Sequence, residues 1–109
     1  MPPSEELRPL VLVVDDEPSM RALMMSTLRE HYRVIASADG RDALATFGVV
    51  AEPIAAVVTD VLMPRMDGLA LAEAIRWLAT PPPVLFVSGL PLDSHQLPGP
   101  FLFKAIRAR

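Results

Sequence analysis

The sequence predicts one α/β domain with an open, doubly wound parallel sheet. Short apolar runs alternate with segments of helical periodicity, which is the order typical of βαβ units. The runs are apolar throughout and do not alternate with polar residues, so we expect helices on both faces of the sheet. The chain has 109 residues, of which 51% are hydrophobic, enough for one domain with a substantial core. We therefore expect a single domain over residues 1–109, with its core at about residues 9–104.

Composition excludes several classes of function. The net charge is −3 and no basic stripe is present, so we expect no nucleic-acid partner. The absence of cysteine excludes disulfides, a thiolate nucleophile and cysteine-ligated metal, and it fits a cytosolic protein. No apolar run approaches the ~18 residues of a membrane span, and the acidic segment 1–6 does not resemble a signal peptide. We expect a cytoplasmic protein with no membrane partner.

The first half of the chain predicts two strands around one helix. The apolar run Leu10–Val14 and the run Arg33–Ser37 are the strands. Pro18 lies near the first helical turn, where its missing N–H group costs nothing. After it, residues repeat at the helical spacing i, i+3, i+4, i+7, i+8, which predicts one buried stripe. These residues are Met20, Leu23, Met24, Thr27 and Leu28.

The middle of the chain predicts two further helices around a third strand. Asp39-Gly40 predicts a turn, and a short helix follows with Ala43, Leu44 and Phe47. The third strand starts at Ile54 and ends at Asp60.

The third helix is predicted by an N-cap and a stop signal. Asp67 is a candidate N-cap, and Leu71, Ile75 and Leu78 share a face. Pro81–Pro83 ends the helix, and we expect Trp77 to be a packing residue.

The C-terminal part predicts two more strands, Val84–Ser88 and Phe101–Phe103, without a full helix between them. Residues 81–100 hold six of the twelve prolines, so the segment after Ser88 is expected to be an ordered loop with at most one turn. The five residues after Lys104 allow only a helical stub.

Polar residues follow the strands at the points where these end. Parallel strands place their carboxyl ends at one edge of the sheet, where ligands bind in this class of fold. That edge would collect Asp15, Asp16, Asp60, Ser88 and Lys104. Carboxylates suit Mg²⁺, and an aspartate can act as a nucleophile and form an aspartyl-phosphate. Lysine supplies a point charge for phosphoryl oxygens, and the serine hydroxyl could donate a hydrogen bond to them.

The chain resembles the receiver domains of bacterial two-component response regulators. Four segments carry the resemblance, in the right order along the chain: Val13–Glu17, Asp60–Gly68, Val87–Gly89 and Phe101–Lys104. The resemblance implies a flavodoxin-like five-stranded parallel sheet of order 2-1-3-4-5. It also implies a signalling phosphoacceptor, and not an enzyme in the usual sense. A partner histidine kinase or phosphotransfer protein would phosphorylate it in the presence of Mg²⁺, which would switch a protein-interaction surface.

The resemblance further assigns roles to single residues. Asp60 would be the phosphoacceptor, and Asp15 and Asp16 the acidic pair that binds Mg²⁺ together with Asp60 and the backbone carbonyl of Leu62. Ser88 would be the switch hydroxyl and Lys104 the phosphate-contacting lysine. For Phe101, a switching role and a simple packing role both stay open.

The chain departs from the family at its C-terminal end. Ala105 follows Lys104 where the family usually has a proline in a cis peptide, and we predict a trans bond because a non-proline cis bond costs about 3–4 kcal/mol. The fourth helix is expected to be shortened or absent and the fifth truncated. The fourth and fifth strands would then expose apolar faces. This end could pair with a second copy of the chain or with another protein, or the sequence could be a truncated one of marginal stability.

Rival functions stay open beside the phosphoacceptor. A receiver-like interaction module that phosphorylation does not switch is favoured by Ala105 and the missing helices, and disfavoured by the intact acidic set. A haloacid-dehalogenase-like phosphatase would have Asp-x-Asp after the first strand, where this chain has Asp15-Asp16-Glu17. A flavodoxin would need a hydroxyl- and glycine-rich phosphate loop there.

Overall fold

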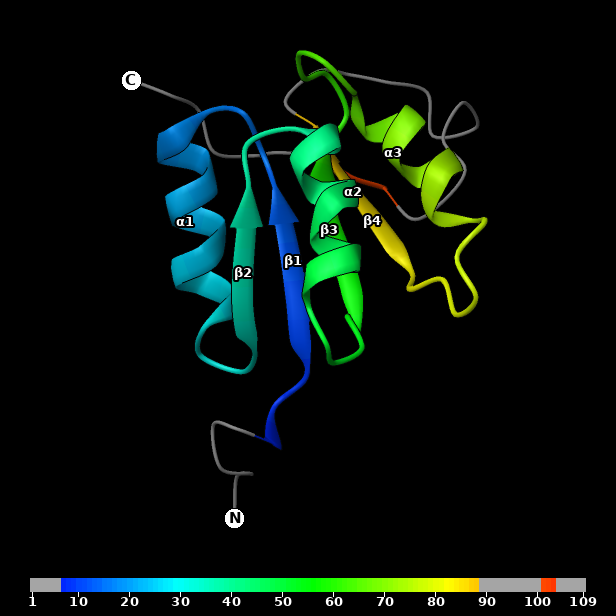
Figure 1. Ribbon diagram of the computed structural model, residues 1–109. Helices are drawn as coiled ribbons and strands as arrows, with labels where there is room; N and C mark the ends of the chain where they lie inside the picture. The colour runs from blue at the N-terminus through cyan, green and yellow to red at the C-terminus, as the bar shows by residue number, and fades with distance from the viewer. Residues whose placement is uncertain (1–6, 89–100, 104–109) are drawn as a thin grey trace.

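The protein forms a five-stranded parallel sheet in the order β2-β1-β3-β4-β5, seen in a computed structural model that describes residues 7–88 and 101–103 (Figure 1). The predicted fold class and strand order are confirmed. The strands are β1 (Leu10–Val14), β2 (Arg33–Ser37), β3 (Ala56–Asp60), β4 (Val84–Ser88) and β5 (Phe101–Phe103). The helices are α1 (Pro18–Leu28), α2 (Gly40–Val49) and α3 (Gly68–Ile75).

Helices cover both faces of this sheet. Right-handed crossovers that move in opposite directions along a sheet lie on opposite faces, so α1 is separated from α2 and α3. Accordingly, α1 packs against β1 and β2, whereas α2 and α3 contact each other in front of the strands (Figure 1). Alternate residues of β1, such as Leu12, join Leu71 and Ile75 of α3 in the main hydrophobic cluster. All five residues of β1 are buried, as expected for a central strand.

The strand register brings the functional ends together. Val14, the last residue of β1, pairs with Ser37 on one side and Thr59 on the other. Asp60 at the end of β3 pairs with Val87 of β4. The residues that follow β1 and β3 therefore emerge at the same edge of the sheet.

The first helix begins as predicted but is less buried than predicted. Pro18 occupies the first turn, and the side chain of Glu17 caps the helix by accepting from the N–H groups of Ser19 at 3.3 Å and Met20 at 2.8 Å. The predicted buried stripe is wrong, because no residue of α1 counts as buried and Leu23 is exposed. Among the described elements α1 contacts the edge strand β2 and its neighbour β1.

Caps define the starts of the other two helices. Asp39, which the sequence predicted to lie in a turn before a short helix, is the N-cap of α2 and accepts from the Asp42 N–H at 2.9 Å. The predicted N-cap of α3 is confirmed, since the Asp67 carboxylate accepts from the Ala70 N–H at 2.8 Å. Short polar side chains at such positions accept hydrogen bonds from backbone N–H groups that have no partner within the helix.

Two boundaries differ from the sequence expectations. The strand β3 begins at Ala56, although Ile54 is buried beside it. The helix α3 ends at Ile75, before the prolines, and a tighter turn follows in which the Leu78 N–H donates to the Ile75 carbonyl at 3.0 Å. Leu78 still packs on the core, but Trp77 points outward and is 79% exposed, so its predicted packing role is wrong.

Several expectations concern residues that lie outside the described ones. They include the loop and shortened fourth helix over 89–100, the helical stub after residue 104 and the peptide bond before Ala105. In the described part, no helix is both long and apolar enough to span a membrane.

Candidate functional site

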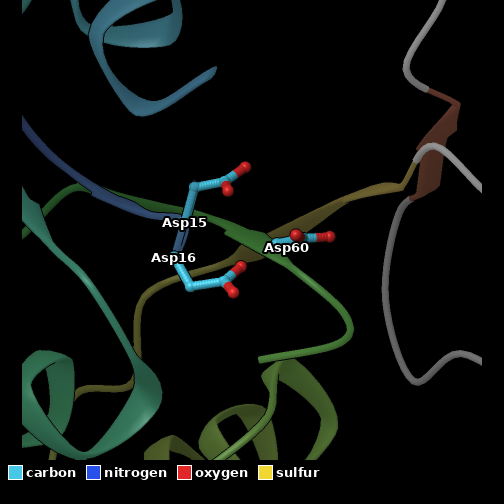
Figure 2. A group of neighbouring side chains, drawn as sticks. All are labelled: Asp15, Asp16 and Asp60. Carbon is cyan, nitrogen blue, oxygen red and sulfur yellow. The ribbon is translucent and has the colours of Figure 1, made fainter. Parts of the chain in front are cut away.

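Three aspartates form a compact acidic group at the carboxyl edge of the sheet. Asp15 and Asp16 follow β1 and Asp60 ends β3, and their carboxylates gather in one region (Figure 2). Each of them offers an oxygen, and these oxygens all lie within 4.8 Å of one another. Asp15 is buried, Asp60 half-buried and Asp16 exposed. The site is therefore anchored in the protein on one side and open to solvent on the other.

Hydrogen bonds hold Asp15 in place. Its backbone N–H donates to the Ser37 carbonyl at 3.2 Å, and its carbonyl accepts from the Arg21 guanidinium at 2.8 Å. Its Oδ1 accepts from the Glu17 N–H at 2.9 Å. The turn after β1 is thus fixed from both sides. The contribution of Arg21 was missed at the level of sequence, because its spacing from Asp15 carries no chemical signal of its own.

The close approach of α3 fixes the backbone of Asp60. Its Oδ1 accepts from the N–H of Val61 at 2.8 Å, which sets the rotation of the carboxyl group. The N–H of Gly68 donates to the Val61 carbonyl at 2.8 Å. A Cβ atom at Gly68 would lie 2.1 Å from the carbonyl oxygen of Asp60. Only glycine lets α3 begin so close to the end of β3.

The loop between β3 and α3 contains a strained turn. Arg65 has φ 66° and, among the described residues, is the non-glycine residue with positive φ. The Met66 N–H donates to the Pro64 carbonyl at 2.7 Å, closing a three-residue turn around Arg65. Such turns with positive φ at the centre are rare and strained. Leu62, whose carbonyl is predicted from the family resemblance to be a Mg²⁺ ligand, lies in this loop with an exposed side chain.

An ion-pair cluster joins this loop to the start of α2. The Arg65 Nε donates to the Asp39 carboxylate at 2.7 Å, and its Nη2 contacts both Asp39 and Asp42, the latter at 3.2 Å. Asp39 is buried. The N–H of Asp42 and then the Arg65 guanidinium hold the pKa of the Asp39 carboxyl below its usual range, against the opposing effect of burial. The sequence did not reveal this cluster, because its members are distant in the chain.

The remaining predicted site residues are placed only in part. Ser88 is the last residue of β4 and pairs in register with Phe103, and Phe101 is the first residue of β5. Both backbones thus belong to the strands that the sequence predicted. Their side chains, and all of Lys104, lie outside the described part of the structure, so their roles stay predictions.

The acidic group fits a hard divalent cation. Mg²⁺ prefers oxygen ligands, binds through one or two carboxylates and keeps several waters. Asp15, Asp16 and Asp60 supply such oxygens at mutual distances short enough to share one ion, and the exposed side leaves room for water or a phosphoryl group. Without a cation, adjacent carboxylates repel one another. The donor set is therefore that of a cation site next to a candidate nucleophile.

Solved structures of related fold agree with this architecture. The chemotaxis protein CheY4 of Vibrio cholerae superposes with a TM-score of 0.80 at 28% sequence identity, covering 92% of this chain and 89% of that one. The response regulator TrrA of Thermotoga maritima, described in complex with Mg²⁺-BeF, has a TM-score of 0.74 at 27% identity, with 89% of this chain and 87% of that one covered.

Sequence comparison gives the family. The response regulator MprA of Mycolicibacterium vanbaalenii is 33% identical over 111 residues, which cover 91% of this chain and 47% of the relative. The chain thus spans less than half the length of that relative. The family model for the response regulator receiver domain matches residues 11–95. The chain therefore belongs to the receiver domains of two-component response regulators.

Proposed function

We propose that the protein accepts a phosphoryl group on Asp60 from a partner histidine kinase or phosphotransfer protein. Mg²⁺ would be held by Asp15, Asp16, Asp60 and the backbone carbonyl of Leu62. The observation that carries the proposal is the convergence of three carboxylates at one edge of the sheet. The description of the related TrrA in complex with Mg²⁺-BeF supports it.

The transfer itself needs little covalent assistance from the protein. A carboxylate oxygen of Asp60 attacks the phosphorus of a phosphohistidine, so that an O–P bond forms as the N–P bond breaks. The electron pair of the broken bond returns to the imidazole nitrogen. Phosphoryl transfer depends mostly on positioning and on neutralising charge, and Mg²⁺ held by the acidic group would supply the charge neutralisation.

The described residues provide the positioning. Asp60 is half-buried, so its carboxylate can meet a donor, while its Oδ1 is oriented by the N–H of Val61 at 2.8 Å. Asp15 is buried and fixed by three hydrogen bonds, so it needs no rearrangement to hold a cation. A preorganised site of this kind avoids the cost of ordering ligands during the reaction.

Phosphorylation would shift the protein between two conformations. The new charge on Asp60 would draw in Ser88 and Lys104, and Phe101 would reposition to alter a protein-interaction surface. We expect a protein with this signalling role to act in the cytoplasm. The end of the sheet formed by β4 and β5 is the proposed surface for pairing with a second copy. Light scattering would test this pairing, and a clean monomer at high protein concentration would contradict it.

Intact-protein mass spectrometry tests the proposed function. The wild type and Asp60→Asn are incubated with acetyl phosphate, with Mg²⁺ or with a chelator, and circular dichroism confirms that both are folded. We expect one added phosphoryl group in the wild type with Mg²⁺ only. A folded wild type that gains no phosphoryl group would contradict the proposal and favour the unswitched interaction module. A gain in Asp60→Asn would place the phosphoacceptor elsewhere.

A further inference from the structure

We propose that the ion pair between Arg65 and Asp39 positions the β3–α3 loop for Mg²⁺ binding. Arg65 would be a positioning residue, since it acts through the loop that carries the Leu62 carbonyl and does not itself bind the cation. The inference rests on the proposed function, because it concerns the affinity of the same cation site. Breaking the pair should therefore weaken Mg²⁺ binding.

The first argument is the strained backbone at Arg65. A non-glycine residue at φ 66° is strained compared with the right-handed region, because its Cβ comes too close to the following carbonyl oxygen. Such strain persists only where the surroundings hold it in place, and it concentrates at functional sites. Arg65 lies three residues beyond Leu62 in the same loop, so relaxation at Arg65 would move the segment that contains the Leu62 carbonyl.

The second argument is that the side chain of Arg65 holds the β3–α3 loop in this conformation. Its Nε and Nη2 both reach the Asp39 carboxylate, and Nη2 also reaches Asp42 at 3.2 Å. A guanidinium that makes several hydrogen bonds fixes direction as well as distance. Asp39 is itself buried, and its side chain caps α2. Arg65 thus pairs with a residue at the start of the helix α2 and not with another loop.

The third argument is that the same loop touches α2 through its backbone. The Gly40 N–H donates to the Met66 carbonyl at 2.9 Å. A Cβ at Gly40 would lie 2.4 Å from that oxygen, so the two backbones are in direct contact. The loop is therefore held against α2 on one side and, through Gly68, against the end of β3 on the other. The ion pair between Arg65 and Asp39 adds a side-chain contact to these backbone contacts.

Charge and geometry predict opposite results for one variant. Removing the positive charge of Arg65 leaves the region more negative, so simple electrostatics predicts tighter Mg²⁺ binding in Arg65→Gln. A positioning role predicts weaker binding, because the ligand loop is released. Outer residues that orient metal ligands typically contribute a factor of about 10–100 in affinity. The direction of the change therefore separates the two explanations.

The test is Mg²⁺ titration of the full chain by isothermal titration calorimetry, with folding checked by circular dichroism. We expect Arg65→Gln and Asp39→Asn to bind Mg²⁺ about tenfold more weakly than the wild type. Asparagine at position 39 keeps the capping ability, so α2 stays intact in the second variant. The matched control is Arg33→Gln, which breaks the Arg33–Glu52 ion pair at the other end of the sheet and should leave affinity unchanged.

A glycine substitution tests the role of the backbone. Arg65→Gly removes the same charge as Arg65→Gln but accepts positive φ without steric cost. We expect Arg65→Gly to bind Mg²⁺ more tightly than Arg65→Gln, and an Arg65→Gly protein that binds no better would overturn the role of strain.

The outcomes distinguish this inference from the proposed function. A wild type that binds Mg²⁺, together with an Arg65→Gln variant that binds equally or more tightly, would overturn the positioning role and leave the phosphoacceptor intact. A folded wild type that does not bind Mg²⁺ would overturn both.

Discussion

The two ends of the sheet use the same kind of ion pair in different settings. At the functional end, Arg65 pairs with Asp39, whose side chain is only 6% exposed. At the opposite end, Arg33 of β2 pairs with Glu52, whose side chain is 44% exposed. Exposed pairs contribute little to stability, whereas a pair with a buried carboxylate must be kept intact, because an unpaired buried charge is costly.

The glycines show the same contrast. At the functional end, Gly40 and Gly68 lie where an added Cβ would meet backbone oxygen at 2.4 and 2.1 Å. Near the C-terminal end of α2, no described atom lies within 4 Å of a Cβ built on Gly48. Of the three glycines in the described part of the chain, the two near the acidic group are thus the ones with no room for a side chain. We infer that the backbone at the functional end tolerates substitution poorly, because its close contacts fix its geometry.

The largest effect is expected from adding one methyl group at the functional end. Gly68→Ala forces Asp60 and α3 apart and should destabilise the fold by about 3 kcal/mol, the upper range for overpacking. Gly48→Ala is the matched control. It lies within α2 with open space around it and should stabilise the protein by up to about 1 kcal/mol. Urea denaturation measures both. Equal effects would contradict the contrast between the two ends.

Removing the carboxylates of the two ion pairs should give the next largest difference. Asp39→Ala loses the cap of α2 as well as the Arg65 pair, and loss of a cap alone costs about 1 kcal/mol. Glu52→Ala should change the melting temperature much less, because its carboxylate is partly exposed. Thermal denaturation followed by circular dichroism compares them. A larger loss in Glu52→Ala would reverse the comparison.

Acid should reduce stability in part through the Asp39 carboxylate at the functional end. The pKa of Asp39 is lower in the folded protein than in the unfolded chain, so between these two values the unfolded chain binds more protons. The stability that the Asp39 carboxylate contributes is therefore fully present above about pH 4. It is lost as the pH drops through the pKa of the folded state. We expect Asp39→Asn to show a shallower loss of stability below pH 4 than the wild type. Parallel profiles of denaturation midpoint against pH would contradict this.

The smallest effect is expected at Trp77, the exposed aromatic residue beyond the end of α3. Trp77→Ala should change the free energy of unfolding by no more than about 0.5 kcal/mol, because the side chain is 79% exposed. Denaturation followed by circular dichroism provides the measurement. A loss of several kcal/mol would show that Trp77 is packed after all.

Patterns local in the chain could be predicted, and those that depend on tertiary packing could not. The strands followed from apolar runs and their order from the resemblance to receiver domains, and the gathering of Asp15, Asp16 and Asp60 followed from parallel strands sharing one edge. The absence of buried residues in α1 and the exposure of Trp77 could not be foreseen. Helical periodicity gives the face of a helix, but not how much surface its neighbours offer.

The ion-pair cluster shows the same limit within the site itself. Asp39 was predicted to be a turn residue, and Arg65, although it lies in the segment Asp60–Gly68, was assigned no role. Their contact exists because α2 begins where the β3–α3 loop passes, a meeting set by the sheet order.

The most direct test of the account is to locate the phosphoryl group by chemistry. The wild type is phosphorylated with acetyl phosphate and Mg²⁺, then treated with borohydride, which reduces an aspartyl-phosphate to homoserine. Tandem mass spectrometry of the peptides identifies the modified residue. We predict homoserine at position 60 in the wild type with Mg²⁺, and none when Mg²⁺ is chelated. Homoserine at position 15 or 16, or at no position in a folded protein, would contradict the assignment of Asp60 as the phosphoacceptor.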